Sequence, residues 1–385
     1  MSSSMPRRAA RGFSLVELLV SVLVGMLAIV FATRLFVSSE QNKAAAVGGS
    51  DAVQNGMLAM FSISNDASQA GWGLNDTLLS GCDTTFSDTA GYALPVVLRG
   101  AVETTPLAPV IIESGGTASD RITLMAGSAM SGVGSERLRD NYAGAGSINV
   151  ATNQPFGFLQ GTVVVVAPEP AGGKCALAQL SATPPGFTLN FDAGAAFRFN
   201  RAALGNAYSA GQARVYNLGP VQQLAFHTWS VVNGNLMLRA TDLAGASANA
   251  AAVADNIVAI KAQYGFDTRA GAAFDPATGM RVGAWSASMT DADGDGVTAG
   301  AGDFQRVAAV RLAVIARAKM PEKPDPVTKQ CSATTGPLTV FAGRSPAAVA
   351  AAPVTVNVDT RADWKCYRYR AFETIVPIRN AAWRP

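Results

Sequence analysis

Residues 11–20 read Arg11-Gly12-Phe13-Ser14-Leu15-Val16-Glu17-Leu18-Leu19-Val20, and this stretch decides the fold. The residues before it are polar and basic, with three arginines and no acid in the first twelve positions. The 21 residues from Phe13 to Thr33 are apolar, and Glu17 is their sole charge. A helix of that length rises about 31 Å, enough to cross the apolar core of a bilayer. The sequence therefore predicts a membrane-spanning helix whose preceding arginines lie on the cytoplasmic side.

Two other interpretations of this N-terminus remain open. A secretory signal peptide also has a basic start, and Ala44 to Ala46 offer small residues for its cleavage, but its apolar region is usually about 7–15 residues long. An ordinary signal anchor leaves Glu17 unexplained, because an acid inside a membrane helix costs about 2.5–3.5 kcal/mol. Such a residue is by default functional and needs a partner.

The order of Gly12, Phe13, Glu17 and an uninterrupted apolar helix resembles the class III signal of type IV pilins and type II secretion pseudopilins. The resemblance implies that a prepilin peptidase cleaves after Gly12 and that Phe13 is then N-methylated. It also implies that Glu17 pairs with the N-terminal amine of a neighbouring subunit. Removing one member of a buried charge pair costs of order 3–5 kcal/mol, so we expect Glu17 to set the register of assembly.

The helix is predicted to continue as an amphipathic extension over residues 34–72. Apolar side chains recur there at helical spacing, at Val53, Met57, Met60 and Phe61. Gly71 and Gly73 provide a stop signal after it. The alternative is a pair of helices with a break near Gly48, because paired glycines weaken a helix.

Short β-branched runs alternate with turn residues after about residue 75, which predicts strands. The sequence therefore predicts an α+β fold, in which a cleaved leader (1–12), a membrane and assembly helix (13–33) and its extension (34–72) precede a β-rich extracytoplasmic domain (73–385). Surface insertions are expected near 126–147, 244–254 and 342–353. The expected strands are Leu94–Leu98, Val110–Glu113, Arg121–Met125, Thr162–Ala167, Phe187–Phe191, Val221–Val232, Leu236–Ala240, Ile257–Asp267, Val307–Arg317 and Tyr367–Val376.

Several segments resemble minor pilins of the PilW family, namely Asn55–Phe61, Ile257–Asp267, Val307–Arg317 and Tyr367–Asn380. The resemblance implies a structural subunit that helps initiate or prime type IV pilus assembly. Its expected partners are other minor and major pilins, the prepilin peptidase, the inner-membrane assembly machinery and the membrane itself. We expect it in the inner membrane with its C-terminal domain in the periplasm, and then in the pilus at the cell surface. A type II secretion minor pseudopilin and a pilus-borne adhesin or calcium-binding module are the alternatives.

Composition excludes several function classes. The chain has one histidine, His227, so no multi-histidine metal site exists and any Ser-His-Asp apparatus must use that residue. On a predicted strand it is expected to be a half-buried packing residue, and no enzyme site is predicted. The net charge of +3 comes from the three leader arginines, since 27 basic and 27 acidic residues remain without them. We therefore expect no nucleic-acid partner.

Four cysteines lie beyond the predicted membrane helix, at Cys82, Cys175, Cys331 and Cys366. An extracytoplasmic domain is oxidised, so two disulfides are expected, and the absence of a CxxC motif argues against zinc. Three connectivities are possible. We favour Cys331–Cys366, which leaves Cys82–Cys175.

An acidic stretch begins like a calcium loop. Asp291, Asp293 and Asp295 alternate and Gly296 follows, a pattern in which carboxylates converge on one cation. The twelfth position is Gly302 where such loops have Glu, and Asp303 comes one residue late. A calcium site at Asp291, Asp293 and Asp295 is one expectation, and an acidic solvated turn is the other. No other cofactor is predicted.

Overall fold

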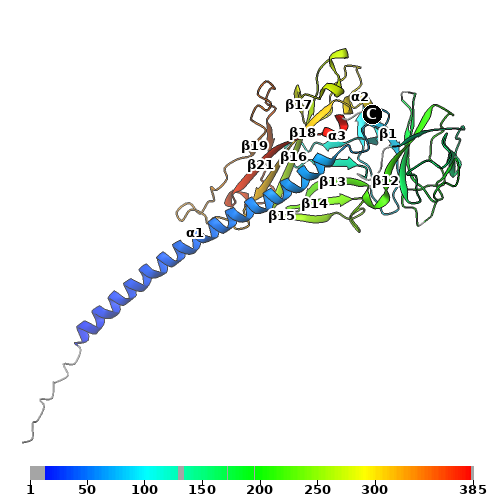
Figure 1. The fold of residues 1–385 in the computed structure, drawn as a ribbon. Coiled ribbons are helices and arrows are strands. Elements are labelled where there is room, and N and C mark those ends of the chain that lie inside the picture. Colours follow the sequence, from blue (N-terminus) through cyan, green and yellow to red (C-terminus); the bar gives the residue numbers. More distant parts are fainter. Residues whose placement is uncertain (1–13, 129–133, 171, 195, 383–385) are drawn as a thin grey trace, which may run out of the picture.

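One long helix opens the fold. The computed structural model describes residues 14–128, 134–170, 172–194 and 196–382 (Figure 1). Helix α1 (Leu15–Gln69) runs without a break through Gly48 and Gly49, so the alternative of two helices is wrong. Gly71 follows its end with a φ of 84°, a left-handed conformation that glycine adopts readily. The first part of the helix projects into space and the second part lies on the domain (Figure 1).

The second part of α1 packs on an antiparallel four-stranded sheet. Its order is β17 (Ala284–Ser286), β16 (Ile257–Phe266), β18 (Val307–Arg317) and β21 (Tyr369–Pro377). Strand β18 is buried almost along its whole length, because α1 covers one face and a small two-stranded sheet, β19 (Leu338–Val340) with β20 (Val354–Val356), packs near the other. Its residues are apolar as far as Ala316 except for Arg311, which is buried and donates hydrogen bonds to Gln263 Oε1 and the Ala352 carbonyl.

A five-stranded antiparallel sheet closes the core next to the helix. Its order is β15 (Ala251–Asp255), β14 (Asn235–Ala240), β13 (Ala225–Val232), β6 (Arg121–Ala126) and β5 (Val110–Glu113). One hydrophobic cluster joins residues of this sheet, the four-stranded sheet and α1. The turn Asn233-Gly234 connects β13 to β14 as a hairpin, as the sequence predicts.

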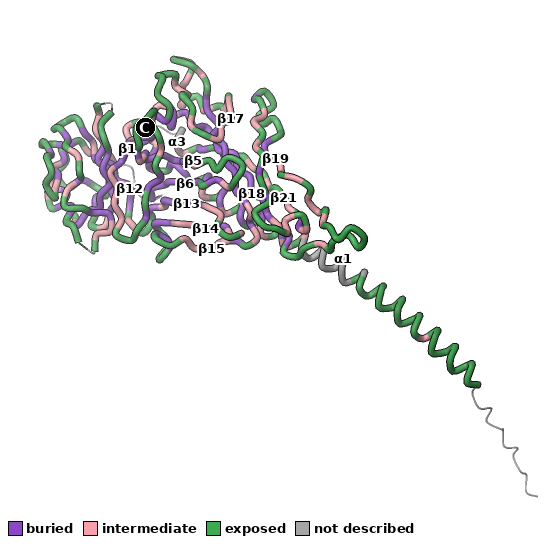
Figure 2. The backbone as a smooth tube through the Cα atoms, turned by 180° about the vertical axis from the view of Figure 1, so that it is seen from behind, coloured by how far each residue is buried: buried purple, intermediate pink, exposed green. Residues whose placement is uncertain are grey.

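A third sheet forms a lobe far from the projecting helix (Figure 1). Its order is β4 (Pro106–Leu107), β1 (Cys82–Thr85), β10 (Cys175–Gln179), β9 (Thr162–Pro168), β12 (Ala213–Pro220) and β7 (Ser135–Arg137), and β1 pairs with β10 in parallel. The pair β8 (Ser147–Asn149) and β11 (Thr188–Asn190) covers a separate hydrophobic cluster of this lobe. Figure 2 shows this buried interior. The lobe thus has a core of its own.

The remaining elements are short. A hairpin joins β2 (Val97–Arg99) to β3 (Val102–Thr104). The short helices are α2 (Ala301–Phe304), α3 (Arg379–Ala382) and the 3₁₀ turns η1 (Val221–Gln223), η2 (Gly271–Ala273), η3 (Pro276–Thr278) and η4 (Trp364–Cys366).

The α+β architecture is as predicted, with local corrections. The expected strand Leu94–Leu98 overlaps β2 only at Val97 and Leu98, because β3 pairs only with Val97–Arg99. The expected insertion near 126–147 contains β7, which pairs with β12. The expected strand Val221–Val232 starts as the turn η1, and pairing begins at Ala225, because the chain turns there after Pro220 at the end of β12. The expected insertion near 244–254 contains most of strand β15. Its alanines form a strand because β14 supplies the hydrogen-bonded ladder on one side.

Candidate assembly interface

The projecting part of α1 is apolar around its whole circumference. The span Leu15–Val37 is long and apolar enough to cross a membrane, and none of it is buried against the domain. A helix that is apolar all round needs a lipid or protein environment to cover it. Its two charged residues are Glu17 and Arg34, near the two ends.

Glu17 is exposed in the first turn of this helix. The predicted cleavage and methylation positions, Gly12 and Phe13, lie outside the described residues. The helix begins with Ser14 as its N-cap residue, directly after them. Four positions separate Phe13 from Glu17, a rise of about 6 Å in a helix.

The docked part of α1 buries a stripe of mostly small side chains. The buried positions are Ala52, Gly56, Ala59, Ile63, Ala67 and Ala70, which recur at helical spacing. Small residues let the helix axis approach the sheet closely. At Gly56 an added Cβ atom would lie 2.1 Å from the ring of Phe372 in β21, so only glycine fits that ring there.

Two of the four apolar residues that the sequence analysis names on this part, Met57 and Phe61, point away from the sheet. Met57 is 60% exposed and Phe61 is 69% exposed, whereas Met60 is partly buried. Leu58 is also exposed. The outer surface of α1 therefore stays partly apolar beyond the projecting span.

His227 in β13 joins the helix to the five-stranded sheet. Its Nδ1 lies 2.7 Å from Oδ2 of Asp66 in α1, and its Nε2 lies 2.7 Å from Oδ1 of Asp242. The indole Nε1 of Trp229 donates a hydrogen bond of 2.8 Å to the same Asp66 oxygen. The sequence analysis predicts a half-buried packing residue at His227 and does not predict these hydrogen bonds. Since both ring nitrogens have a carboxylate partner, this histidine is a structural bridge and has no free nitrogen to act as a base.

The two carboxylates keep this imidazole protonated. Burial alone would lower the pKa of His227, but the hydrogen bonds to Asp242 and Asp66 and their charges outweigh it and raise the pKa to about 9. At neutral pH the bridge is thus a cation between two anions, and most of it is shielded from water. Such an arrangement fixes where the end of α1 sits on the sheet.

Asn380 holds the end of the same helix. Its side-chain Nδ2 donates toward the backbone carbonyls of Ser68, Gln69 and Ala70, at 3.4, 3.1 and 3.4 Å. The last carbonyls of a helix have no partner within the helix, so this amide supplies one. The C-terminal segment after β21 thereby caps the N-terminal helix.

Two disulfides are present, Cys82–Cys175 and Cys331–Cys366. This is the pairing that the sequence analysis favours. The first joins β1 to β10 within the distal lobe. The second joins residue 331, in the segment between β18 and β19, to the turn η4 before β21.

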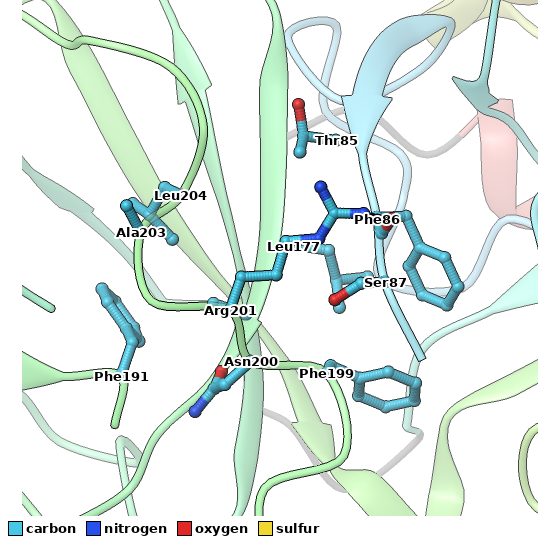
Figure 3. A pocket seen from close by; sticks show the side chains of 11 residues that line it. Thr85, Phe86, Ser87, Leu177, Phe191, Phe199, Asn200, Arg201, Ala203 and Leu204 are labelled. Carbon is cyan, nitrogen blue, oxygen red and sulfur yellow. Dashed lines mark hydrogen bonds between the residues drawn. The ribbon is translucent and has the colours of Figure 1, made fainter. Parts of the chain in front are cut away.

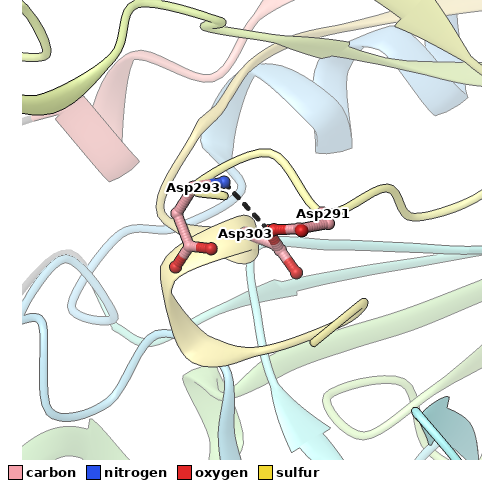
Figure 4. A group of neighbouring side chains, drawn as sticks. All are labelled: Asp291, Asp293 and Asp303. Carbon is pink, nitrogen blue, oxygen red and sulfur yellow. Dashed lines mark hydrogen bonds between the residues drawn. The ribbon is translucent and has the colours of Figure 1, made fainter. Parts of the chain in front are cut away.

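In the acidic loop the third carboxylate of the group is Asp303, whereas the sequence predicts Asp295. Asp291, Asp293 and Asp303 have oxygens within 4.8 Å of one another, whereas the Asp295 carboxylate accepts a hydrogen bond from the Val297 N–H (Figure 4). The late acid at 303 comes into the group because α2 folds back over the loop.

Asp303, the buried residue of this group, is hydrogen-bonded to backbone N–H groups. The Asp303 carboxylate accepts hydrogen bonds from the N–H groups of Ala292, Asp293 and Gly300. Burial raises its pKa, and the neighbouring charge of Asp293 adds to the shift. Those hydrogen bonds give Asp303 a structural role of its own. The calcium prediction stays a prediction, and calorimetric titration of the full chain with Ca²⁺ tests it.

A small hollow in the distal lobe offers little room for a ligand. Phe86, Leu177, Phe191, Phe199 and Arg201 are among its lining residues (Figure 3). Its volume is about 10 Å³. That is room for about one water molecule, whereas small-molecule sites usually measure about 300–1,000 Å³.

Two parts of the chain match known protein families. Residues 227–380 match the family of type IV pilus-assembly protein W (PilW), and residues 7–33 match the prokaryotic N-terminal methylation motif. The PilW match begins at His227 and ends at Asn380, so it contains both residues that fix the end of α1. No curated protein and no solved structure matches the chain. Both matched families are structural components of pili.

Proposed function

We propose that this chain is a minor pilin of the PilW family, as its match over residues 227–380 supports, and that it helps initiate type IV pilus assembly by packing its N-terminal helix against those of other pilins. The observation that carries the proposal is the projecting helix Leu15–Val37, which is apolar on all sides and uncovered by its own domain. The methylation motif over residues 7–33 fits a pilin anchored in the inner membrane by this helix.

Assembly would use the helix twice. Before assembly it crosses the inner membrane, with the leader in the cytoplasm and the β-rich domain in the periplasm. In the assembled pilus at the cell surface, neighbouring helices of minor and major pilins replace the lipid. The exposed Met57, Leu58 and Phe61 extend the apolar surface beyond the membrane span and support such packing.

Glu17 would select the register between subunits. Cleavage after Gly12 by the prepilin peptidase creates an amine at Phe13, and an unpaired carboxylate inside an apolar assembly is costly. Pairing with the amine of a neighbouring subunit removes that cost in one relative position of the two helices. The inner-membrane assembly machinery would supply the energy for extraction.

The test is Glu17→Gln in the host cell, with Ser21→Ala one turn further along the helix as the matched control. We expect Glu17→Gln to be processed and membrane-anchored but to lose pilus incorporation by about 100-fold, as a loss of about 3 kcal/mol predicts. Intact mass of the mature chain should show a methylated Phe13 at its start. Normal incorporation of Glu17→Gln contradicts the pairing. Loss of protein secretion with normal twitching in a deletion strain would favour a type II secretion pseudopilin.

The distal lobe supports a second function, that of a binding module borne on the pilus. Residues 134–220 lie outside both family matches, contain their own hydrophobic cluster and stand at the end of the domain opposite the projecting helix. Phe156 is 100% exposed and Leu159 is 58% exposed on this lobe. We expect Phe156→Ser with Leu159→Ser to reduce adhesion of piliated cells and leave twitching unchanged. Normal adhesion of this variant counts against the module.

A further inference from the structure

The end of the domain that faces the projecting helix can be identified from contacts. Gly56 of α1 lies against Phe372 of β21, and Ala70 lies near Asn380, which follows that strand. Strand β21 therefore runs in the same direction as α1. Arg317 at the end of β18 pairs with Tyr369 at the start of β21. The segments that follow Arg317 and precede Tyr369 therefore lie where the helix leaves the domain. Figure 2 shows exposed loops at this place.

These loops, residues 319–337 and 357–370, are here called the membrane-facing loops. They carry seven basic and four acidic residues. Four of the seven lysines of the chain are among them, although the chain without its leader arginines has no net charge. The basic residues are Lys319, Lys323, Lys329, Arg361, Lys365, Arg368 and Arg370. Even with the neighbouring Asp255 this end remains positive.

Most of this positive charge is free to meet a partner. Lys319, Lys323 and Lys329 are exposed and form no ion pair within the described residues. Three of the four acids have partners: Glu322 pairs with Arg368, Asp363 pairs with Arg361, and Asp325 accepts hydrogen bonds from the Val327 and Thr328 N–H groups. Asp359 is exposed and has no ion pair among the described residues, so the three lysines outnumber this one acid.

Apolar side chains stand among these lysines. Val327 is 86% exposed and Met320 is 50% exposed, in a loop (319–337) that also contains four prolines. A groove of about 450 Å³ lies beside this segment, lined by residues 333–338 with Arg368, Tyr369 and Arg370. Basic side chains around exposed apolar ones are typical of surfaces that meet a lipid headgroup layer.

We propose that the membrane-facing loops dock onto anionic phospholipid headgroups of the membrane that holds α1. This inference rests on the proposed membrane anchor. Lys319, Lys323 and Lys329 attract the headgroup phosphates, Val327 enters the interface, and the groove beside Arg370 accepts a headgroup. Docking would hold the domain in one orientation above the bilayer before assembly, and leaving the membrane would release it.

The distances allow this contact. Gly56, level with Phe372, lies 19 residues beyond Val37, or about 28 Å along the axis. Strand β21 begins three residues earlier, about 10 Å nearer the membrane. The headgroup layer occupies about 5–7 Å of the remaining distance. About 11–13 Å then remain between the start of β21 and the headgroups, a gap that loops of 19 and 14 residues are long enough to span.

The experiment uses the full chain, reconstituted into vesicles of phosphatidylcholine with or without phosphatidylglycerol. The described cysteines are all in disulfides, so Gln330→Cys provides a specific site for a dye. A nitroxide on the lipid headgroup quenches this dye only near contact. We expect strong quenching with phosphatidylglycerol, and little without it or in high salt. Lys319→Gln, Lys323→Gln and Lys329→Gln together should lower the docking constant about 100-fold, about five-fold for each lysine.

The matched control removes three positive charges from the other end of the domain, as Arg281→Gln, Arg344→Gln and Arg379→Gln, all at exposed positions. We expect this control to quench like the parent. Equal quenching in both lipids, or equal losses in both triple variants, would overturn the docking proposal. Vesicle flotation separates the two hypotheses, because a chain that fails to float overturns the membrane anchor as well, whereas a floating chain without lipid-dependent quenching overturns docking alone.

Discussion

The two parts of helix α1 have opposite surfaces on one continuous axis. The projecting part, Leu15–Val37, presents large aliphatic side chains on all sides and buries none of them. The docked part buries alanines and Gly56 and turns Met57 and Phe61 outward. The docked part therefore approaches its own sheet mostly with small side chains, together with Ile63 and part of Met60, whereas the projecting part has no such contact.

Polar contacts divide in the same way. In the docked part, Asp66 and the end of the helix have partners in the domain, through His227 and Asn380. In the projecting part, Glu17 is exposed. Directional hydrogen bonds to the domain thus fix the docked part of the helix, whereas the projecting part has no contact with the domain through Glu17.

The largest effect is expected at the bridge between helix and sheet. His227→Gln removes the cation between Asp66 and Asp242 and leaves two partly buried carboxylates close together. We expect the free energy of unfolding to fall by about 3 kcal/mol, the order found when one partner of a buried ion pair is removed. Denaturant unfolding in detergent measures it. Ser21→Ala in the projecting part should change it by less than about 0.5 kcal/mol, and an equal loss in both variants would erase the distinction between the two parts.

The same bridge predicts how stability depends on pH. The pKa of His227 rises from an ordinary value of 6.5 to about 9 on folding, because Asp242 and Asp66 outweigh burial. The folded state therefore binds a proton that the unfolded state loses first. Its stabilising contribution is complete below about pH 6.5 and disappears as the pH rises from there to 9, by up to about 3 kcal/mol. His227→Gln should remove this slope, and a slope that persists in the variant would assign it to other groups.

The sequence predicts the helix better than the way it docks. The membrane span and the helix stop near Gly71 follow from a long apolar run and glycine punctuation, which are local signals. Strand β18 follows from the alternation of Val310, Leu312 and Val314 with Arg311. The sequence shows Val53, Met57, Met60 and Phe61 at helical spacing, which indicates an amphipathic helix but does not say which residues contact the sheet. The structure buries small residues at the same spacing, and only the neighbouring ring of Phe372 explains why.

No local sequence pattern predicts the contacts that fix the end of α1 on the domain. Asp66 and His227 are 161 positions apart, and the Asn380 amide reaches residues more than 300 positions away. Asp303 joins the acidic loop because α2 folds back, although spacing favours Asp295. Pairings of this kind depend on the tertiary arrangement of the sheets, which a single sequence does not reveal. The cysteines are different: counting leaves three connectivities, and the favoured pair Cys331–Cys366 with Cys82–Cys175 is the one in the structure.

A smaller effect on stability is expected when glycines in the two parts of α1 are compared. Gly56→Ala places a Cβ atom against the ring of Phe372, whereas Gly25→Ala meets nothing within 4 Å. Overpacking costs about 1–3 kcal/mol, and the higher helix propensity of alanine returns up to about 1 kcal/mol. We expect Gly56→Ala to lower the free energy of unfolding of the domain by about 1–2 kcal/mol and Gly25→Ala to leave it unchanged. Phe372→Leu should reduce the penalty at Gly56, and equal effects of the two glycine variants would contradict close docking.

The smallest effect is expected at the cap of the docked part. Asn380→Ala removes the amide that faces the carbonyls of Ser68, Gln69 and Ala70, which then turn to water. A net loss of about 1 kcal/mol is expected for such hydrogen bonds. Asn65→Ala, at an exposed position of the same helix, is the control and should be neutral or slightly stabilising because alanine favours helices. Amide hydrogen exchange adds a local readout: the last turn of α1 should exchange faster in Asn380→Ala alone, because the cap acts on that turn and leaves the buried stripe and the projecting span untouched.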